Sequence, residues 1–182
     1  MGADFHIRNS DKLVYEYLQL EFSITPEEQE RVFWDATSYG AKMPHVEEML
    51  AHLRKSGICS WVISNIGWSG KALKERIDRL LPDNNFEFII ASSEYIVRKP
   101  NPMIFELALR KAQLSANEVW YCGDNAMCDV EGASSARIFP VWYLSATPDN
   151  FKPPDATPNC EHLYITNWLK LVTALKKAEE RK

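Results

Sequence analysis

The interpretation of the chain starts from residues 119–136, which read Val119-Trp-Tyr-Cys-Gly-Asp-Asn-Ala-Met-Cys-Asp-Val-Glu-Gly-Ala-Ser-Ser-Ala136. The first four residues form an apolar run that stops at Gly123, and the small residues near the end suit a tightly packed helix. We therefore predict a strand, a turn and a helix. Ligands of open α/β sheets sit beyond the carboxyl ends of the strands. Asp124 is therefore expected in the functional crevice, with Asp129 facing it from the first helical turn.

Two carboxylates on such a short stretch of backbone suit a hard divalent ion. Mg²⁺ takes one or two carboxylates from a protein and keeps waters and phosphate oxygens as its other ligands. The alternative interpretation is structural: Asp124 caps the helix and Asp129 is a solvated surface charge. These two residues alone leave both interpretations open.

Composition bounds the class of protein. The 182 residues fit one domain, or one domain with a small appendage. A net charge of −4 gives no reason to expect a nucleic-acid partner, and no apolar run is long enough to span a bilayer. The four cysteines show neither paired zinc spacing nor a dense disulfide pattern. We therefore expect buried, reduced thiols in a cytoplasmic protein without a membrane or nucleic-acid partner.

The first 42 residues are predicted to hold two helices and no strand. The first helix is expected at residues 10–22 with Ser10 as its cap. The second is expected to begin at Thr25-Pro26-Glu27-Glu28, because Thr25 and Glu28 can form a capping box and Pro26 fits the first turn.

Beyond residue 43, helical and strand patterns alternate. This alternation predicts an α/β fold with a mainly parallel, Rossmann-like sheet that is covered by helices on both faces. The predicted helices run from Val46 until Gly57 and over 71–81, 103–112 and 168–178; the predicted strands cover 59–63, 86–91, 119–122, 138–144 and 163–165; a proline-bearing loop occupies 148–158.

Three short motifs lie at or after the carboxyl ends of successive predicted strands. They are Val62-Ile63-Ser64-Asn65, Lys99-Pro100-Asn101-Pro102-Met103-Ile104-Phe105, and Gly123-Asp124 with Asp129 and Gly132-Ala133. In this order and setting they resemble the haloacid dehalogenase superfamily of hydrolases, in its phosphatase branch with a helical cap. The detailed resemblance covers residues 44 to 145. By this resemblance, residues 1–42 are part of the helical cap and residues 43–182 are the α/β core.

The resemblance implies a role for each matching residue. Ser64 would donate its hydroxyl to a phosphate oxygen, helped by the backbone N–H of Asn65. Lys99 would place a positive charge against the phosphate and the attacking carboxylate. Asp124 and Asp129 would hold Mg²⁺. The implied activity is Mg²⁺-dependent hydrolysis of a small phosphorylated metabolite.

The chain departs from the family at the nucleophile. The family uses an aspartate of an Asp-x-Asp motif at the end of a central strand, and this sequence has no such motif: Asp4-Phe5-His6 follows only three residues, and its second carboxylate position is a histidine. A missing central strand would leave backbone groups unpaired at roughly 1–3 kcal/mol each. We expect that the sequence begins downstream of the true start. The alternatives are that the flanking strands re-pair or that another chain supplies the strand.

Two further functions remain open at this point. The chain could be a catalytically inactive relative that binds a phosphorylated ligand or a protein partner. It could also be a dehalogenase or a phosphotransferase on the same fold, although a dehalogenase needs no metal carboxylates. The sequence leaves the substrate's identity and the oligomeric state open.

Overall fold

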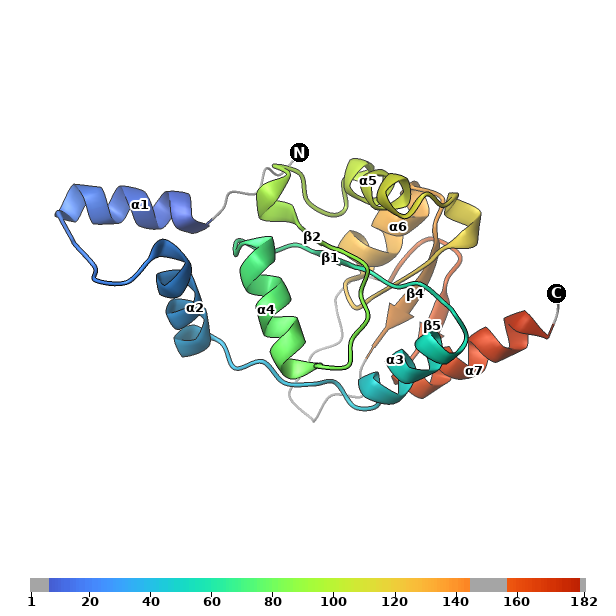
Figure 1. Ribbon diagram of the computed structural model, residues 1–182. Helices are drawn as coiled ribbons and strands as arrows, with labels where there is room; N and C mark the ends of the chain where they lie inside the picture. The colour runs from blue at the N-terminus through green and yellow to red at the C-terminus, as the bar shows by residue number, and fades with distance from the viewer. Residues whose placement is uncertain (1–6, 145–156, 181–182) are drawn as a thin grey trace. The chain divides into compact units, whose positions relative to one another are not determined.

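The computed structural model describes the backbone of residues 7–144 and 157–180, with side chains from residue 11 onward (Figure 1). The motif-like Asp4-Phe5-His6 and most of the predicted proline-bearing loop lie outside these residues. The chain divides into two compact units. The first comprises residues 1–42 and 60–98, and the second comprises residues 43–59 and 99–182.

The first unit holds helices and a short parallel sheet. Strands β1 and β2 pair in parallel, with Val62 opposite Ile89 and Ser64 opposite Ala91. A 3₁₀ turn follows β2 directly. The elements are α1 (Ile7–Leu18), α2 (Pro26–Thr37), β1 (Val62–Ser64), α4 (Gly70–Leu80), β2 (Ile89–Ala91) and the 3₁₀ turn η1 (Ser92–Glu94).

Of the two helix starts predicted in this unit, the start of α2 is confirmed and the start of α1 is wrong. The capping box before α2 is present: the Glu28 N–H donates to Thr25 Oγ1 at 3.3 Å, and the Thr25 N–H donates to Glu28 Oε2 at 2.9 Å. The backbone hydrogen bond from Thr25 lowers the pKa of Glu28. Ser10 does not cap α1, because that helix already begins at Ile7. Gln19 adopts a left-handed φ of 54°, and α1 therefore ends before the predicted limit.

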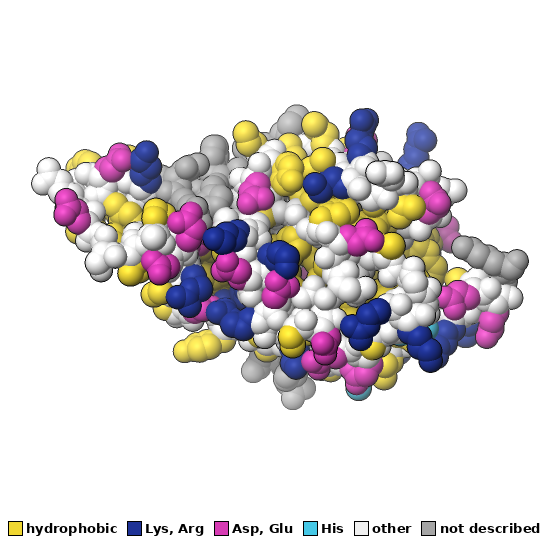
Figure 2. All heavy atoms as spheres, in the orientation of Figure 1, with side chains coloured by type: hydrophobic (Ala, Val, Ile, Leu, Met, Phe, Trp, Pro, Cys, Tyr) yellow, Lys and Arg dark blue, Asp and Glu magenta, His cyan; other side chains and the backbone are white. Residues whose placement is uncertain are grey.

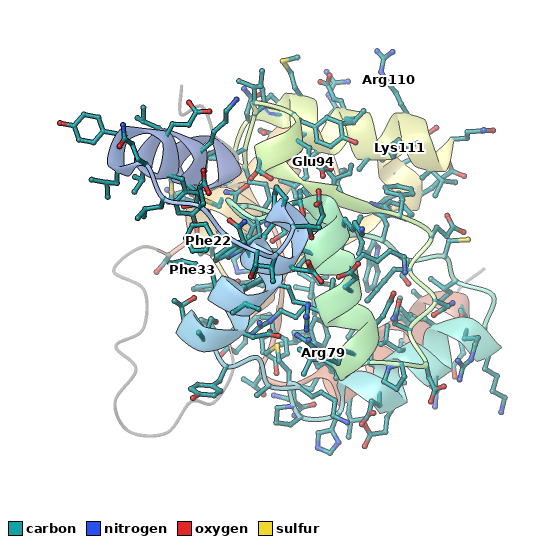
Figure 3. All side chains as sticks on the ribbon, turned by 60° about the vertical axis from the view of Figure 1, so that its left-hand side comes forward. Phe22, Phe33, Arg79, Glu94, Arg110 and Lys111 are labelled. Carbon is teal, nitrogen blue, oxygen red and sulfur yellow. The ribbon has the colours of Figure 1, made fainter. Side chains whose placement is uncertain are left out.

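Helix α2 is attached to α4 by a buried carboxylate. Glu30 is only 2% exposed. Its two oxygens accept hydrogen bonds from the Ser69 backbone N–H at 2.6 Å and from the Ser69 hydroxyl at 2.7 Å. Ser69 is the N-cap of α4, so the negative charge also lies at the positive end of the helix dipole. Glu94, which Figure 3 shows beside the start of α4, accepts from the Gly70 N–H at 2.8 Å.

A second contact between α2 and α4 combines aromatic rings with charge. The rings of Trp34 and Trp68 stack with centroids 5.2 Å apart, and the Arg76 guanidinium lies 4.7 Å from the Trp34 centroid. Asp35 accepts hydrogen bonds from Arg76 at 3.0 Å and from Arg79 at 2.7 Å. Figure 3 shows Arg79 near the end of α4, on the side that faces α2. The two helices are therefore held together along most of their length.

Helices α1 and α2 and the segment between them expose apolar side chains. Hydrophobic side chains are visible over this part of the first unit in Figure 2. Tyr17 is 83% exposed, and Phe22 and Phe33, labelled in Figure 3, are 50% and 51% exposed. Clustered apolar exposure of this kind is typical of contact surfaces.

The second unit is a three-stranded parallel sheet with helices. The strand order is β3-β4-β5, with Cys122 opposite Val141 and Val141 opposite Leu163. The elements are α3 (Val46–Lys55), α5 (Pro102–Ala112), the 3₁₀ turn η2 (Ala116–Glu118), β3 (Trp120–Gly123), the π-helical segment η3 (Ala126–Glu131), α6 (Gly132–Ser135), β4 (Phe139–Tyr143), β5 (Leu163–Ile165) and α7 (Trp168–Glu179).

Both faces of this sheet are covered. Phe105 of α5 meets Tyr121 of β3 edge to face, with centroids 5.0 Å apart. The ring of Trp168 in α7 packs on the ring of Tyr143 in β4, with centroids 4.6 Å apart. Tyr121 lies opposite Pro140, so Tyr143, three residues further on, points to the other face. Figure 1 accordingly shows α5 and α6 on one side of the strands and α3 and α7 on the other. The predicted α/β class, with parallel strands and helices on both faces, is confirmed.

All five predicted strands are present, and three of them, β1, β2 and β4, are shorter than expected. The strand predicted at 59–63 is β1 at Val62–Ser64, and the one predicted at 86–91 is β2 at Ile89–Ala91. The strand predicted at 163–165 agrees with β5. Strand β1 belongs to the two-stranded sheet and β3 to the three-stranded sheet.

Several expectations outside the strands can be compared with the structure. The compact units group residues 60–98 with residues 1–42, while the division into a cap at 1–42 and a core at 43–182 stays a prediction. None of the four cysteines forms a disulfide, but the expectation that they are buried is wrong: Cys59 is exposed, and Cys122, Cys128 and Cys160 are only partly buried. Among the described helices, none is both long and apolar enough to cross a membrane.

We predict that Glu30→Gln lowers the free energy of unfolding by about 2 kcal/mol, the range of one charge-assisted hydrogen bond. The amide keeps the size of the side chain but turns one acceptor into a donor that faces the Ser69 N–H or hydroxyl. Urea denaturation followed by circular dichroism measures the change. Glu75→Gln, at an exposed position of α4, is the control and should change stability by less than about 0.5 kcal/mol. Equal effects of both substitutions would contradict the role of Glu30.

Candidate functional site

The turn after β3 holds Asp129 in a fixed position. Gly123 makes this possible, because a Cβ atom on it would lie 2.3 Å from both Cβ and Cγ of Asp129. The backbone N–H of Asn125 donates to Asp129 Oδ2 at 3.0 Å. The Asn125 side chain accepts from the Cys128 N–H at 2.7 Å and caps the π-helical segment. The carboxylate is thus packed against the strand end and not directed into solvent.

Lys99 forms a buried ion pair with Asp129. The Lys99 Nζ atom lies 2.5 Å from Asp129 Oδ1, and the two side chains are only 10% and 5% exposed. The Tyr121 hydroxyl accepts from Lys99 Nζ at 2.9 Å and donates to Asp129 Oδ1 at 3.2 Å. Burial, followed by the charge of Asp129, raises the pKa of Tyr121 well above its ordinary value, so the phenol stays protonated. The interpretation of Asp129 as a solvated surface charge is wrong.

Asp124, unlike the buried Asp129, is exposed to solvent. It follows the last residue of β3 and its side chain is exposed. Its backbone carbonyl accepts a hydrogen bond from Trp142 Nε1 at 3.1 Å, which fixes the backbone at this point. Within the described part of the chain, no residue bonds to its carboxylate. Asn125, and not Asp124, caps the following helical segment, so the capping interpretation of Asp124 is also wrong.

The donor chemistry of this turn fits Mg²⁺. Asp124 offers an exposed carboxylate, and Asp129 keeps a lone pair on Oδ2, because Lys99 and Tyr121 bond to Oδ1 and only the Asn125 N–H bonds to Oδ2. No group of three or more His, Cys, Asp or Glu side chains suited to a metal ion occurs among the described residues. A site of two carboxylates is nevertheless sufficient for Mg²⁺, which keeps several waters and phosphate oxygens as ligands.

Lys99 is placed differently from its predicted setting. Strand β2 ends at Ala91 and is followed by η1, so Lys99 lies eight residues beyond the strand rather than just after it. It is the first residue of this part of the second unit and precedes α5, whose N-cap Asn101 accepts from the Met103 N–H at 3.0 Å. The pairing of Lys99 with Asp129 therefore depends on the segment leading into α5.

Ser64 and Asn65 belong to the first unit. Ser64 is the last residue of β1 and is partly buried. Two serines from η1 hold the loop that follows: Ser92 Oγ accepts from the Ile66 N–H at 2.9 Å, and Ser93 Oγ donates to the Trp68 carbonyl at 2.7 Å. The roles of Ser64 and Asn65 in binding a phosphate that Lys99 also contacts stay predictions.

The sequence reasoning missed the residues that support the site. Tyr121 and Trp142 were assigned to strands, where aromatic residues normally serve the core. Ser92 and Ser93 carried no motif. Only their positions in the sequence could have pointed to these residues: Ser92 and Ser93 directly follow β2, and Tyr121 precedes Gly123 by two residues.

We predict that Gly123→Ala disrupts the turn more than a glycine substitution without steric conflict. The added methyl group must displace Asp129 or the strand end, at a cost of about 1–3 kcal/mol or more. Gly57→Ala is the comparison, because nothing lies within 4 Å of its Cβ position and only its left-handed φ of 66° opposes the change. Urea denaturation should show the larger loss for Gly123→Ala; the reverse order would contradict the packing of Asp129 on Gly123.

We predict that Cys122 resists alkylation in the native protein. Burial raises its pKa to about 12, and only the thiolate reacts. Native protein treated with iodoacetamide at pH 8 should be modified at the exposed Cys59 before Cys122, as peptide mass mapping can show. In urea the pKa returns to about 8.5 and Cys122 should react. Because the folded pKa is the higher one, the stabilisation that depends on the neutral thiol is lost as pH rises from about 8.5 to about 12. Rapid native labelling of Cys122 would contradict the raised pKa of its thiol.

The comparisons with curated proteins identify phosphatases. The chain is 32% identical over 108 residues to a glyceraldehyde 3-phosphate phosphatase of Pyrococcus abyssi. The aligned stretch covers 58% of this chain and 44% of the relative. It is 27% identical over 117 residues to a phosphoserine phosphatase of Thermus thermophilus, covering 64% of this chain and 45% of the relative. The chain thus spans less than half the length of these curated relatives.

The fold has solved counterparts. A HAD phosphatase from Thermococcus onnurineus aligns with a TM-score of 0.63 at 22% identity, over 90% of this chain and 69% of that one. A 2-haloacid dehalogenase from Pseudomonas syringae aligns with a TM-score of 0.56 at 26% identity, over 74% of this chain and 53% of that one. A model of the haloacid dehalogenase-like hydrolases matches residues 25–142, well over half of the sequence. The chain therefore belongs to the haloacid dehalogenase-like hydrolase family.

Proposed function

We propose that the protein is a Mg²⁺-dependent phosphomonoester hydrolase that acts on a small phosphorylated metabolite in the cytoplasm. The observation that carries the proposal is the buried Lys99–Asp129 ion pair, in which Asp129 accepts from the backbone N–H of the residue directly after the exposed Asp124. A lysine ammonium held at a fixed point and a metal-type carboxylate pair are the groups that phosphoryl transfer requires. The names of two relatives, glyceraldehyde 3-phosphate phosphatase and phosphoserine phosphatase, support the substrate class.

Lys99 supplies a positive charge for the transferring phosphoryl group. Its ammonium is held by Asp129 at 2.5 Å and by the Tyr121 hydroxyl at 2.9 Å, so little reorganisation is needed when charge develops in the transition state. The surroundings are largely shielded from water, which strengthens the interaction. A lysine suits this role because its ammonium acts as a compact point charge toward several oxygens.

Asp124 and Asp129 are the residues that would hold Mg²⁺. When bound, the ion would supply charge neutralisation between an anionic phosphate and an anionic nucleophile. Asp129 is fixed by Gly123, Asn125 and Lys99, while the backbone of Asp124 is fixed by Trp142. Ser64 and the N–H of Asn65 would add hydrogen bonds to phosphate oxygens, as the family resemblance implies.

Hydrolysis through a phosphoaspartate also needs a nucleophilic aspartate. No described strand ends in an Asp-x-Asp motif, so this proposal requires a carboxylate from outside the described residues. That observation favours a second candidate function, in which the protein binds a phosphorylated ligand or a protein partner without turnover. Both functions use Lys99, Asp124 and Asp129, and only the nucleophile separates them.

The test is Mg²⁺-dependent phosphate release from a panel of small phosphate esters. It uses the 182-residue chain and the product of the longest reading frame that contains it. We expect turnover in at least one form. Asp124→Asn removes a proposed Mg²⁺ ligand and should lower kcat/KM by about 10²-fold. The loss would not reflect unfolding, because the exposed carboxylate has no role in the fold. Asp83→Asn, also exposed, is the matched control and should leave kcat/KM unchanged.

The outcomes separate the two functions. Binding of inorganic phosphate or Mg²⁺, measured by isothermal titration calorimetry, without turnover in either form would favour the second function. Neither binding nor turnover would overturn both. Turnover that is unaffected by Asp124→Asn would contradict the assigned metal site.

A further inference from the structure

We propose that Tyr121 is a positioning residue for Lys99: its hydroxyl fixes the ammonium in the orientation that the proposed reaction uses. The inference deepens the proposed function and rests on it for its catalytic consequence. Its structural part, the control of Lys99 by Tyr121, stands on the geometry of the second unit alone. Sequence reasoning assigned Tyr121 only to a strand.

The hydroxyl of Tyr121 links both members of the ion pair. Its oxygen accepts from Lys99 Nζ at 2.9 Å, and its proton is donated to Asp129 Oδ1 at 3.2 Å. Lys99 Nζ is bonded to the same Asp129 oxygen at 2.5 Å. The three groups therefore form a closed triangle of hydrogen bonds. An ammonium held by Asp129 alone could swing around that oxygen, whereas two bonds in different directions fix its position.

The ring of Tyr121 is itself held in place. The Phe105 ring of α5 meets it edge to face at 5.0 Å and an interplanar angle of 80°. Phe105 is fully buried. Two carbons of its ring would lie only 3.0 Å from a Cβ atom on Gly132, so the ring is packed closely against this glycine. Lys99 Nζ lies 5.5 Å from the centroid of the Tyr121 ring. The hydroxyl is thus carried by a ring that packing has already oriented, so little entropy is lost when it bonds to Lys99.

A purely structural tyrosine would behave differently on substitution. Loss of a hydroxyl with only a structural role lowers stability and leaves kcat and KM of the folded protein unchanged. Loss of a positioning hydroxyl lets the Lys99 ammonium move and, since Lys99 acts most strongly on the transition state, lowers kcat more than it changes KM.

The experiment compares Tyr121→Phe with Tyr143→Phe. Tyr143 is a buried tyrosine on β4 that points to the opposite face of the same sheet, against Trp168. Both substitutions remove one hydroxyl and keep the ring. The first readout is the side-chain ¹H–¹⁵N spectrum of protein labelled at lysine, recorded without metal or substrate. The Lys99 ammonium signal is assigned from its absence in Lys99→Met, and Lys111, which Figure 3 shows at the far end of α5, serves as a reference signal.

We expect Tyr121→Phe to shift or broaden the Lys99 signal while the Lys111 signal stays unchanged. We expect Tyr143→Phe to leave both signals unchanged. In the form that turns over, Tyr121→Phe should lower kcat by about tenfold with KM altered by less than about threefold, which corresponds to one hydrogen bond to a charged group. Tyr143→Phe should leave the ratio of kcat to KM unchanged.

The outcomes decide the inference independently of the proposed function. An unchanged Lys99 signal in Tyr121→Phe overturns it, whatever the activity. A changed Lys99 signal with unchanged kcat overturns the catalytic role of the positioning. Absence of turnover in every unsubstituted form overturns the proposed function, and the spectra then decide whether Tyr121 positions Lys99.

Discussion

The buried ion pair between Lys99 and Asp129 is the constraint on which the rest of the site depends. Two charges removed from water are stable only when each is well paired, and removing one partner typically costs 3–5 kcal/mol. Here both oxygens of Asp129 are paired: Lys99 and the Tyr121 hydroxyl bond to one oxygen, and the Asn125 N–H bonds to the other. All of these contacts need a close approach to the end of β3, and Gly123 leaves the space for it.

The backbone after β3 has a special form that serves this constraint. The N–H groups of Asp129 and Val130 both donate to the Asn125 carbonyl, at 2.9 and 3.2 Å, within the π-helical segment. A π-helical turn is wider than an α-helical one and occurs often at functional sites. It carries Asp129 back toward the strand while Asp124 stays exposed. Trp142, which lies opposite Gly123 in the parallel ladder, bonds to the Asp124 carbonyl and ties this turn to β4.

The sequence predicted the features that depend on neighbouring residues. The capping box at Thr25 and Glu28, the strand before Gly123 and the parallel α/β pattern all come from local spacing. The pairing of Lys99 with Asp129, 30 positions apart, had no local signal and was not predicted; the family resemblance implied only that both residues serve one phosphate site. Tyr121 and Glu30 were missed for a related reason: an aromatic residue in a strand and a glutamate on a helix have ordinary local meanings, and only tertiary packing gives them buried polar partners.

A buried ion pair is a weak device for holding a fold, because apolar residues of similar size usually do so at least as well. The position of this pair is therefore informative. It lies at the carboxyl end of a parallel strand, where α/β proteins bind ligands, and beside a carboxylate without a bonding partner in the described part of the chain. A fold-stabilising pair would not need that neighbour. The proposed function accounts for this arrangement by a requirement to place positive charge and metal-type carboxylates at one point. Both candidate functions share that requirement, and they differ only in the carboxylate nucleophile.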